Sequence, residues 1–138
     1  MHRKPGDQQG VAIIELALII IAFLILIFGF IEIGLLLFNQ QVITNAAREG
    51  ARHGIVCRPT DYKVPKSEIE DLVKKYAENH VISSENKNFQ VSVVLQSGLN
   101  YCEKFQDVLT VDVAYDYSFL FLPFAKKTLA TRARMICE

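Results

Sequence analysis

The chain has no excess of charge of either sign. Its 138 residues carry 15 basic and 15 acidic side chains, which gives a formal net charge of zero at pH 7. A neutral chain has no broad electrostatic field that would attract nucleic acid or an acidic substrate. The composition therefore predicts no nucleic-acid partner.

The sequence also lacks the short motifs of enzymes and metal proteins. It contains no G-x-S-x-G, no Walker loop, no H-E-x-x-H and no C-x-x-C. His53 and Cys57 could supply two ligands, which do not define a zinc site. Asp112 and Asp116 fall on the polar side of a predicted strand, where solvated charge is ordinary. We therefore expect no enzyme, no metal site and no cofactor.

Polar residues are absent from one stretch near the N-terminus. Residues 16–31 include none, and Glu15 and Glu32 are the only charged residues between positions 11 and 38. Roughly 20 apolar residues cross about 30 Å of hydrocarbon as a helix, and residues 11–31 meet that length. A secretory signal peptide fits poorly, because its apolar region is about 7–15 residues long and ends in a small-residue cleavage site. An uncleaved signal anchor is the simplest alternative.

The residues before the apolar run indicate its orientation. Arg3 and Lys4 stand there against a single Asp7. An excess of Lys and Arg in a short flanking segment places that segment in the cytoplasm. The sequence thus predicts a single-pass protein of the cytoplasmic (inner) membrane, with everything after about residue 38 outside the cytoplasm.

The membrane helix is predicted to continue beyond the bilayer. Residues 39–54 contain no proline, and their apolar residues recur at spacings of three and four, as on one face of a helix. Gly54 can end this helix as the residue after its last turn. A helix over residues 11–54 would be roughly 65 Å long at about 1.5 Å per residue. The residues of the apolar face are Val42, Ile43, Ala46, Ala47 and Ala51.

The rest of the chain predicts a small α+β head over residues 67–138. Residues 55–66 read as a linker with two prolines, and Ser67 and Glu70 have the spacing of a capping box that starts an amphipathic helix over 67–80. Further on, apolar residues alternate with polar ones, which indicates half-buried strands. We expect a roughly three-stranded antiparallel sheet with this helix on one face. The alternation covers residues 89–95, 109–117 and 129–137.

Three cysteines allow three single pairings in this head. A domain of about seventy residues has a marginal core, and a location outside the cytoplasm permits a disulfide. Cys137 continues an apolar strand face, which suggests a buried free thiol, whereas Cys57 and Cys102 lie in loop-like contexts. Elimination favours a Cys57–Cys102 disulfide, although spacing alone fixes no connectivity.

Glu15 is costly where it stands, because an ionisable side chain in the bilayer costs roughly 2.5–3.5 kcal/mol. Glu15, Ala22 and Gly29 are seven residues apart and fall within about 40° of each other on a helix. Such a stripe of small residues is a plausible contact face between membrane helices, and a carboxylate buried there needs a cation. Cleavage after Gly10 would supply one, as the free amine of Val11.

These residues resemble a known processing site. Gly10 followed by an apolar run with glutamate at the fifth position is similar to type IV pilin-like proteins, which a prepilin peptidase cuts on the cytoplasmic side. More specifically, residues 10–56 resemble the N-terminal segment of TadE-like proteins, the pseudopilins or minor pilins of the tight-adherence (Flp) pilus. The ending LATRARMICE also looks like that family. The resemblance lies in Gly10, Glu15, Phe28-Gly29, Glu32, Gly34 and Thr44 to Arg52.

The resemblance implies removal of a cytoplasmic leader, residues 1–10, and a head outside the membrane. It implies three kinds of partner besides the membrane: prepilin peptidase, other pilin or pseudopilin subunits, and the pilus assembly platform. The pilus or cell surface is then a further destination. The alternative is a membrane-anchored extracytoplasmic binding module that never enters a filament and has no use for a cut after Gly10. An enzyme on a membrane tether is a third reading, disfavoured by the missing motifs.

Overall fold

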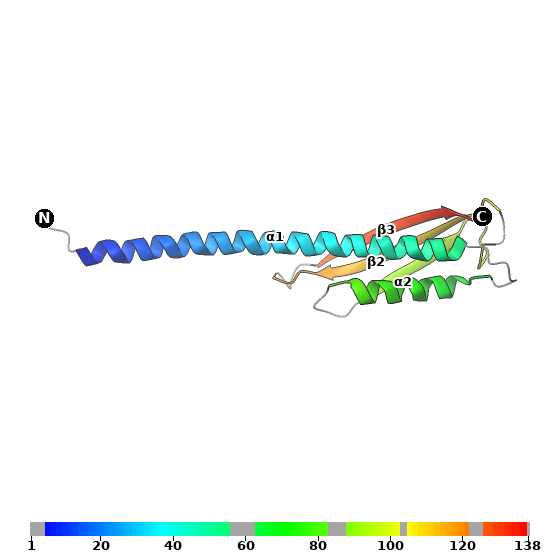
Figure 1. Ribbon diagram of the computed structural model, residues 1–138, viewed down its shortest axis with the longest axis horizontal. Coiled ribbons are helices and arrows are strands. Elements are labelled where there is room, and N and C mark those ends of the chain that lie inside the picture. Colours follow the sequence, from blue (N-terminus) through cyan, green and yellow to red (C-terminus); the bar gives the residue numbers. More distant parts are fainter. Residues whose placement is uncertain (1–4, 56–62, 83–87, 103–104, 122–125, 138) are drawn as a thin grey trace. The chain divides into compact units, whose positions relative to one another are not determined.

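The computed structural model describes residues 5–55, 63–82, 88–102, 105–121 and 126–137. The chain divides into two compact units, Met1–Gly34 and Leu35–Glu138, which we describe separately. The predicted α+β class, with a long N-terminal helix, a second helix and an antiparallel sheet, is confirmed. The elements, shown in Figure 1, are α1 (Pro5–Ile55), α2 (Lys66–His80), β1 (Phe89–Leu95), β2 (Val108–Ser118) and β3 (Lys126–Ile136).

The first unit consists of the N-terminal part of α1. The helix begins at Pro5, ahead of the expected start at residue 11. Proline is tolerated in the first turn, where its missing N–H would have no helical partner. Among the described residues, Gly10–Ile55 is one helix long and apolar enough to cross a membrane, and none of its most apolar window is buried in the structure. Length and composition thus favour a membrane anchor.

The second unit, hereafter the head, is built on a sheet of order β1-β2-β3. Both neighbouring pairs are antiparallel, with Val93 opposite Val111 and Val111 opposite Ala133. The apolar residues of the three predicted alternations share one face of this sheet. Their burial, and the exposure of most residues between them, confirms the alternation as the pattern of a sheet with one covered face.

Both helices cover this face. Ile69, Val73 and Ala77 of α2 are buried there, as expected for the amphipathic helix. The later part of α1 is the second cover: Gln40 Nε2 donates to the carbonyl of Ala130 at 3.2 Å. All five residues of the apolar face predicted for 39–54 are buried in the same core: Val42, Ile43, Ala46, Ala47 and Ala51.

The head therefore begins at Leu35, well before the expected boundary at residue 67. The three-and-four spacing correctly indicated a helical face, but spacing does not say what covers it. The core of the head covers it. A sheet of three strands needs more apolar cover than α2 alone supplies, and α1 provides the remainder.

The predicted capping box at Ser67 is wrong. The helix α2 starts at Lys66, its N-cap is Pro65 in an extended conformation, and no side chain caps it. Backbone groups take over this role: the carbonyl of Pro65 accepts from Glu68 N at 3.1 Å, and Lys66 N donates to the carbonyl of Asn100 at 3.1 Å. A loop carbonyl thus satisfies an amide that the helix itself leaves without a partner.

Candidate functional site

The N-terminal part of α1 carries the predicted assembly stripe. Glu15, Ala22 and Gly29 lie on one unbroken helix, and each of them is exposed. A Cβ added at Gly29 would meet no atom within 4 Å. The helical periodicity that the stripe requires is therefore present, and its three positions are accessible to a neighbouring helix.

The Gly10–Val11 bond, the predicted cleavage site, lies inside the same helix. Gly10 is exposed, and a Cβ built on it would meet no atom within 4 Å. Glycine costs about 1 kcal/mol relative to alanine in a helix interior, so this position eases the local unwinding that a protease needs. Cleavage here would make Val11 the first residue of the helix, with Glu15 four residues into it.

If the chain were cut after Gly10, this spacing would give Glu15 two sources of positive charge. Four residues advance a helix by about 6 Å, roughly one turn, so the side chain at position 15 lies within reach of the start of the chain. The unpaired amides of a helix N-terminus carry about half a positive charge, which favours a carboxylate nearby. A free amine at Val11 adds a full charge.

The disulfide of the structure joins Cys102 to Cys137, with their Cα atoms 5.8 Å apart. The predicted Cys57–Cys102 bond with a free thiol at Cys137 is therefore wrong, and Cys57 itself lies outside the described residues. Backbone hydrogen bonds also hold Cys137, directly after β3. Cys137 N donates to the carbonyl of Asp107 at 2.8 Å, and Gln106 N donates to the carbonyl of Cys137 at 3.1 Å.

Topology explains this pairing. In an antiparallel sheet of order β1-β2-β3, the loop between β1 and β2 and the end of β3 lie at the same end of the sheet. Cys102 is in that loop and Cys137 directly follows β3. Burial of Cys137 on the core face does not indicate a free thiol, because the sulfur of a disulfide is buried equally well. The strand order was the signal that could have found the bond.

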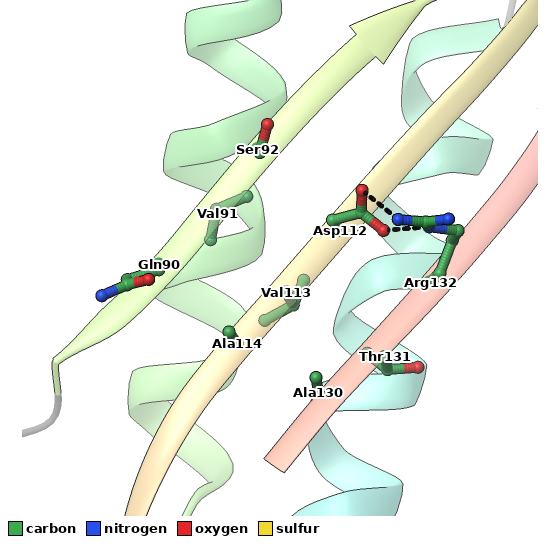
Figure 2. A pocket seen from close by; sticks show the side chains of 9 residues that line it. All are labelled: Gln90, Val91, Ser92, Asp112, Val113, Ala114, Ala130, Thr131 and Arg132. Atoms are coloured by element: carbon green, nitrogen blue, oxygen red, sulfur yellow. Dashed lines mark hydrogen bonds and ion pairs between the residues drawn. The ribbon is translucent and has the colours of Figure 1, made fainter. Parts of the chain in front are cut away.

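The uncovered face of the sheet carries a shallow hollow of about 530 Å³, lined by side chains from all three strands. Figure 2 views it with both helices behind the sheet. Ala114 and Ala130 form its floor between Gln90 and an ion pair, in which Arg132 Nε lies 2.5 Å from Asp112 Oδ1. The hydrogen bonds to Asp112 raise the pKa of Arg132 above its ordinary value. This pair is partly exposed and engages both charges with each other, as in an ordinary solvated sheet surface.

The described part of the chain does not bring potential metal ligands together. No three His, Cys, Asp or Glu side chains there are placed to hold a metal ion. His53 pairs instead with the carboxylate of Glu68 at 3.2 Å, which joins the end of α1 to the start of α2. The arrangement favours a structural role for these polar groups.

Comparison with known proteins finds a family match in the N-terminal segment. A family model described as TadE-like protein matches residues 10–52, about a third of the chain. No curated protein and no solved structure matches the chain. The matched segment contains Gly10, the whole stripe and most of the α1 face that the head covers. The family match agrees with the resemblance found in the sequence: residues 10–52 are similar to TadE-like proteins.

Proposed function

We propose that this chain is a minor pilin or pseudopilin that assembles through its N-terminal helix into a tight-adherence (Flp, type IV-like) pilus or secretion machinery. The single observation that carries the proposal is the family match at residues 10–52. It falls on the one helix that combines a glycine cleavage position, a carboxylate five residues later and an exposed stripe of small residues.

Processing and assembly are linked in this proposal by one charge pair. Prepilin peptidase removes residues 1–10 and leaves the amine of Val11. Glu15 then pairs with that amine, within the subunit or on a neighbouring subunit displaced slightly along the helix axis. The stripe of Ala22 and Gly29 lets the two helices approach closely enough to bury the pair. An unpaired charge left in such a contact costs roughly 3–5 kcal/mol.

The disulfide supports the proposed topology. Disulfides persist in oxidising compartments and are rare in the cytoplasm. The Cys102–Cys137 bond lies in the head, and the basic residues Arg3 and Lys4 precede the apolar run. Both features favour an N-terminus in the cytoplasm and a head outside the inner membrane, where the head can reach other pilus subunits and the assembly platform.

The first experiment determines the N-terminal residue of the protein extracted from membranes. We expect Val11, and we expect replacement of Gly10 by a bulky residue to leave the precursor uncut, because only glycine lets the backbone approach the protease without a Cβ. A chain that keeps Met1 in the assembled state would overturn the pilin proposal. It would favour the membrane-anchored binding module instead.

The second experiment tests the charge pair. Glu15→Ala should insert into the membrane at least as well as the wild type, because it removes a charge from hydrocarbon, but it should co-purify poorly with pilus components. The matched control is Glu49→Ala, on the same helix in the head, whose carboxylate lies 3.4 Å from Arg52 Nε at the surface. Equal assembly of the two variants at equal membrane abundance would refute the role of Glu15.

A further inference from the structure

One end of the head is defined by Leu35, where this unit begins. The helix α1 runs away from this end alongside β3. Gln40, near Leu35, donates to the carbonyl of Ala130 early in β3. Gly54, near the end of α1, lies against Leu109 of β2. Leu109 pairs with Met135, near the end of β3. The first residues of β3, and residues 119–121 directly after its partner strand β2, therefore lie at the Leu35 end.

The same end includes the segment after α2. Asn39, fully buried, donates from Nδ2 to the carbonyl of Ile82 at 2.7 Å, and its Oδ1 accepts from Ile82 N at 3.0 Å. These two bonds fix Ile82 beside the start of the head. Three segments far apart in the sequence thus meet there: the first residues of α1 that belong to the head, the residues directly after α2, and residues 119–121 after β2.

Each of these segments exposes large apolar side chains at this end. We call the group the Leu35-end patch. Its phenylalanine Phe121 is 42% exposed. Lys127, which is exposed, follows near the start of β3 and adds a positive charge. The apolar members of the patch are Leu37, Phe38, Ile82, Leu120 and Phe121.

This combination is typical of a surface that lies in the interface of a membrane. Aromatic and aliphatic side chains immerse at the boundary between headgroups and acyl chains, and lysines extend their charged ends to lipid phosphates. Each lysine near an anionic leaflet contributes attraction that strengthens binding about fivefold. A patch exposed to water would instead leave five large apolar side chains unburied on one end of a small domain.

Chain length places the bilayer at this end. The apolar run predicted to span the membrane ends near residue 31, and the head begins at Leu35. Four helical residues cover only about 6 Å. The headgroup layer on each side of the hydrocarbon is of similar thickness, about 5–8 Å. A bilayer crossed by residues 11–31 would therefore have the first residues of the head within its headgroup layer.

We propose that the Leu35-end patch rests in the outer surface of the bilayer that α1 crosses, with Leu120 and Phe121 at the acyl boundary and Lys127 on phosphate headgroups. This contact fixes the head against the membrane before the subunit leaves it. The inference rests on membrane anchoring by α1, which belongs to the proposed function, but it does not depend on cleavage after Gly10 or on filament assembly.

The chain contains no tryptophan. A single introduced tryptophan is therefore the only source of tryptophan fluorescence, and its emission reports the surroundings of that one position. Phe121→Trp places it in the patch. The matched control is Phe105→Trp, in the connection before β2 at the other end of the head, where the side chain is 74% exposed. Each full-length variant is reconstituted in vesicles of phosphatidylcholine and phosphatidylglycerol, and then in vesicles whose phosphatidylcholine carries brominated acyl chains.

We expect emission of the Phe121→Trp variant to be blue-shifted and to lose most of its intensity in brominated vesicles, while emission of the Phe105→Trp variant stays unchanged. Equal intensity of the Phe121→Trp variant in both vesicle types would overturn the inference. So would emission that shifts only when other pilus subunits are added, since a protein partner would then cover the patch. If Phe121→Trp fails to fold, Leu120→Trp carries the same expectation and the same refuting result.

Alkaline extraction of the same vesicles separates this inference from the proposed function. A chain that is extracted with the supernatant has not inserted, which contradicts the membrane anchoring on which both proposals rest. A chain that stays in the membrane while the Phe121→Trp emission is unquenched contradicts only the contact proposed for the patch.

Discussion

A single methyl group at Gly50 should force α1 and α2 apart. A Cβ built at Gly50 would overlap Cγ2 of Val73 on α2, and it would lie only 3.4 Å from Cγ2 of Ile69. Val73 is fully buried, and its β-branched side chain has one strongly preferred rotamer in a helix, so it cannot turn aside. The clash must be relieved by a shift of the two helices.

The size of the effect follows from two opposing terms. Overpacking a well-filled core costs typically about 1–3 kcal/mol, and replacing glycine by alanine in a helix gains about 1 kcal/mol. We expect Gly50→Ala to lower the free energy of unfolding of the head by about 1 kcal/mol. For a domain of this size that corresponds to a melting temperature lower by about 4–8 °C.

The assay is thermal unfolding of the full chain in detergent micelles, followed by the near-ultraviolet circular dichroism of the buried Tyr115 and Tyr117. The control is the same substitution in a Val73→Ala background, where the space for the new methyl exists. There Gly50→Ala should raise the melting temperature, because the clash is gone and alanine still favours the helix more than glycine does. The two substitutions should thus couple by about 2 kcal/mol, within the range of directly contacting residues. Additive effects would refute the reasoning.

Three further results are expected. Non-reducing peptide mapping should link Cys102 to Cys137, and Cys102→Ser should cost about 4 kcal/mol in the chain-entropy model for their sequence separation of 35; any other linkage would contradict the structure. Asn39→Ala should cost about 1–3 kcal/mol because it removes both hydrogen bonds to the backbone of Ile82, and unchanged hydrogen exchange at that amide would contradict this. Arg132→Ala should change the free energy of unfolding by less than about 1 kcal/mol, because its ion pair is exposed; a larger loss measured by denaturant titration would contradict this.

Hydrophobic periodicity predicted most of the fold. The period of two located all three strands to within three residues at each end, because a sheet covered on one face alternates buried and exposed side chains. The spacing of Ile43, Ala47 and Ala51 located the inner face of α1 for the same kind of reason. These patterns are local, since each strand or helix must present its own apolar residues to whatever covers it.

Features that depend on contacts between distant segments were beyond this reasoning. The start of α2 rests on a backbone bond from Lys66 to Asn100, and the disulfide brings the β1–β2 loop to the end of β3. The patch described above joins residues from three separate segments. Elimination among the cysteines failed because it weighed the local context of each residue, whereas a disulfide is decided by which two chain segments meet.

The small residues of α1 explain why the family match covers one helix and little else. Near the N-terminus, Ala22 and Gly29 have small side chains that would let other membrane helices approach closely, as the proposed assembly requires. Further along, Ala47, Gly50 and Ala51 let it lie close to α2 and the sheet, and a Cβ at Gly50 would overlap Cγ2 of Val73. Large side chains at the latter positions would disrupt the contacts of α1 inside the head. The strands, by contrast, need only an alternation of apolar residues of suitable volume, which many sequences supply. Close neighbours in the head thus require small residues in the second half of the matched segment, and the proposed assembly would require them at Ala22 and Gly29 for the same reason.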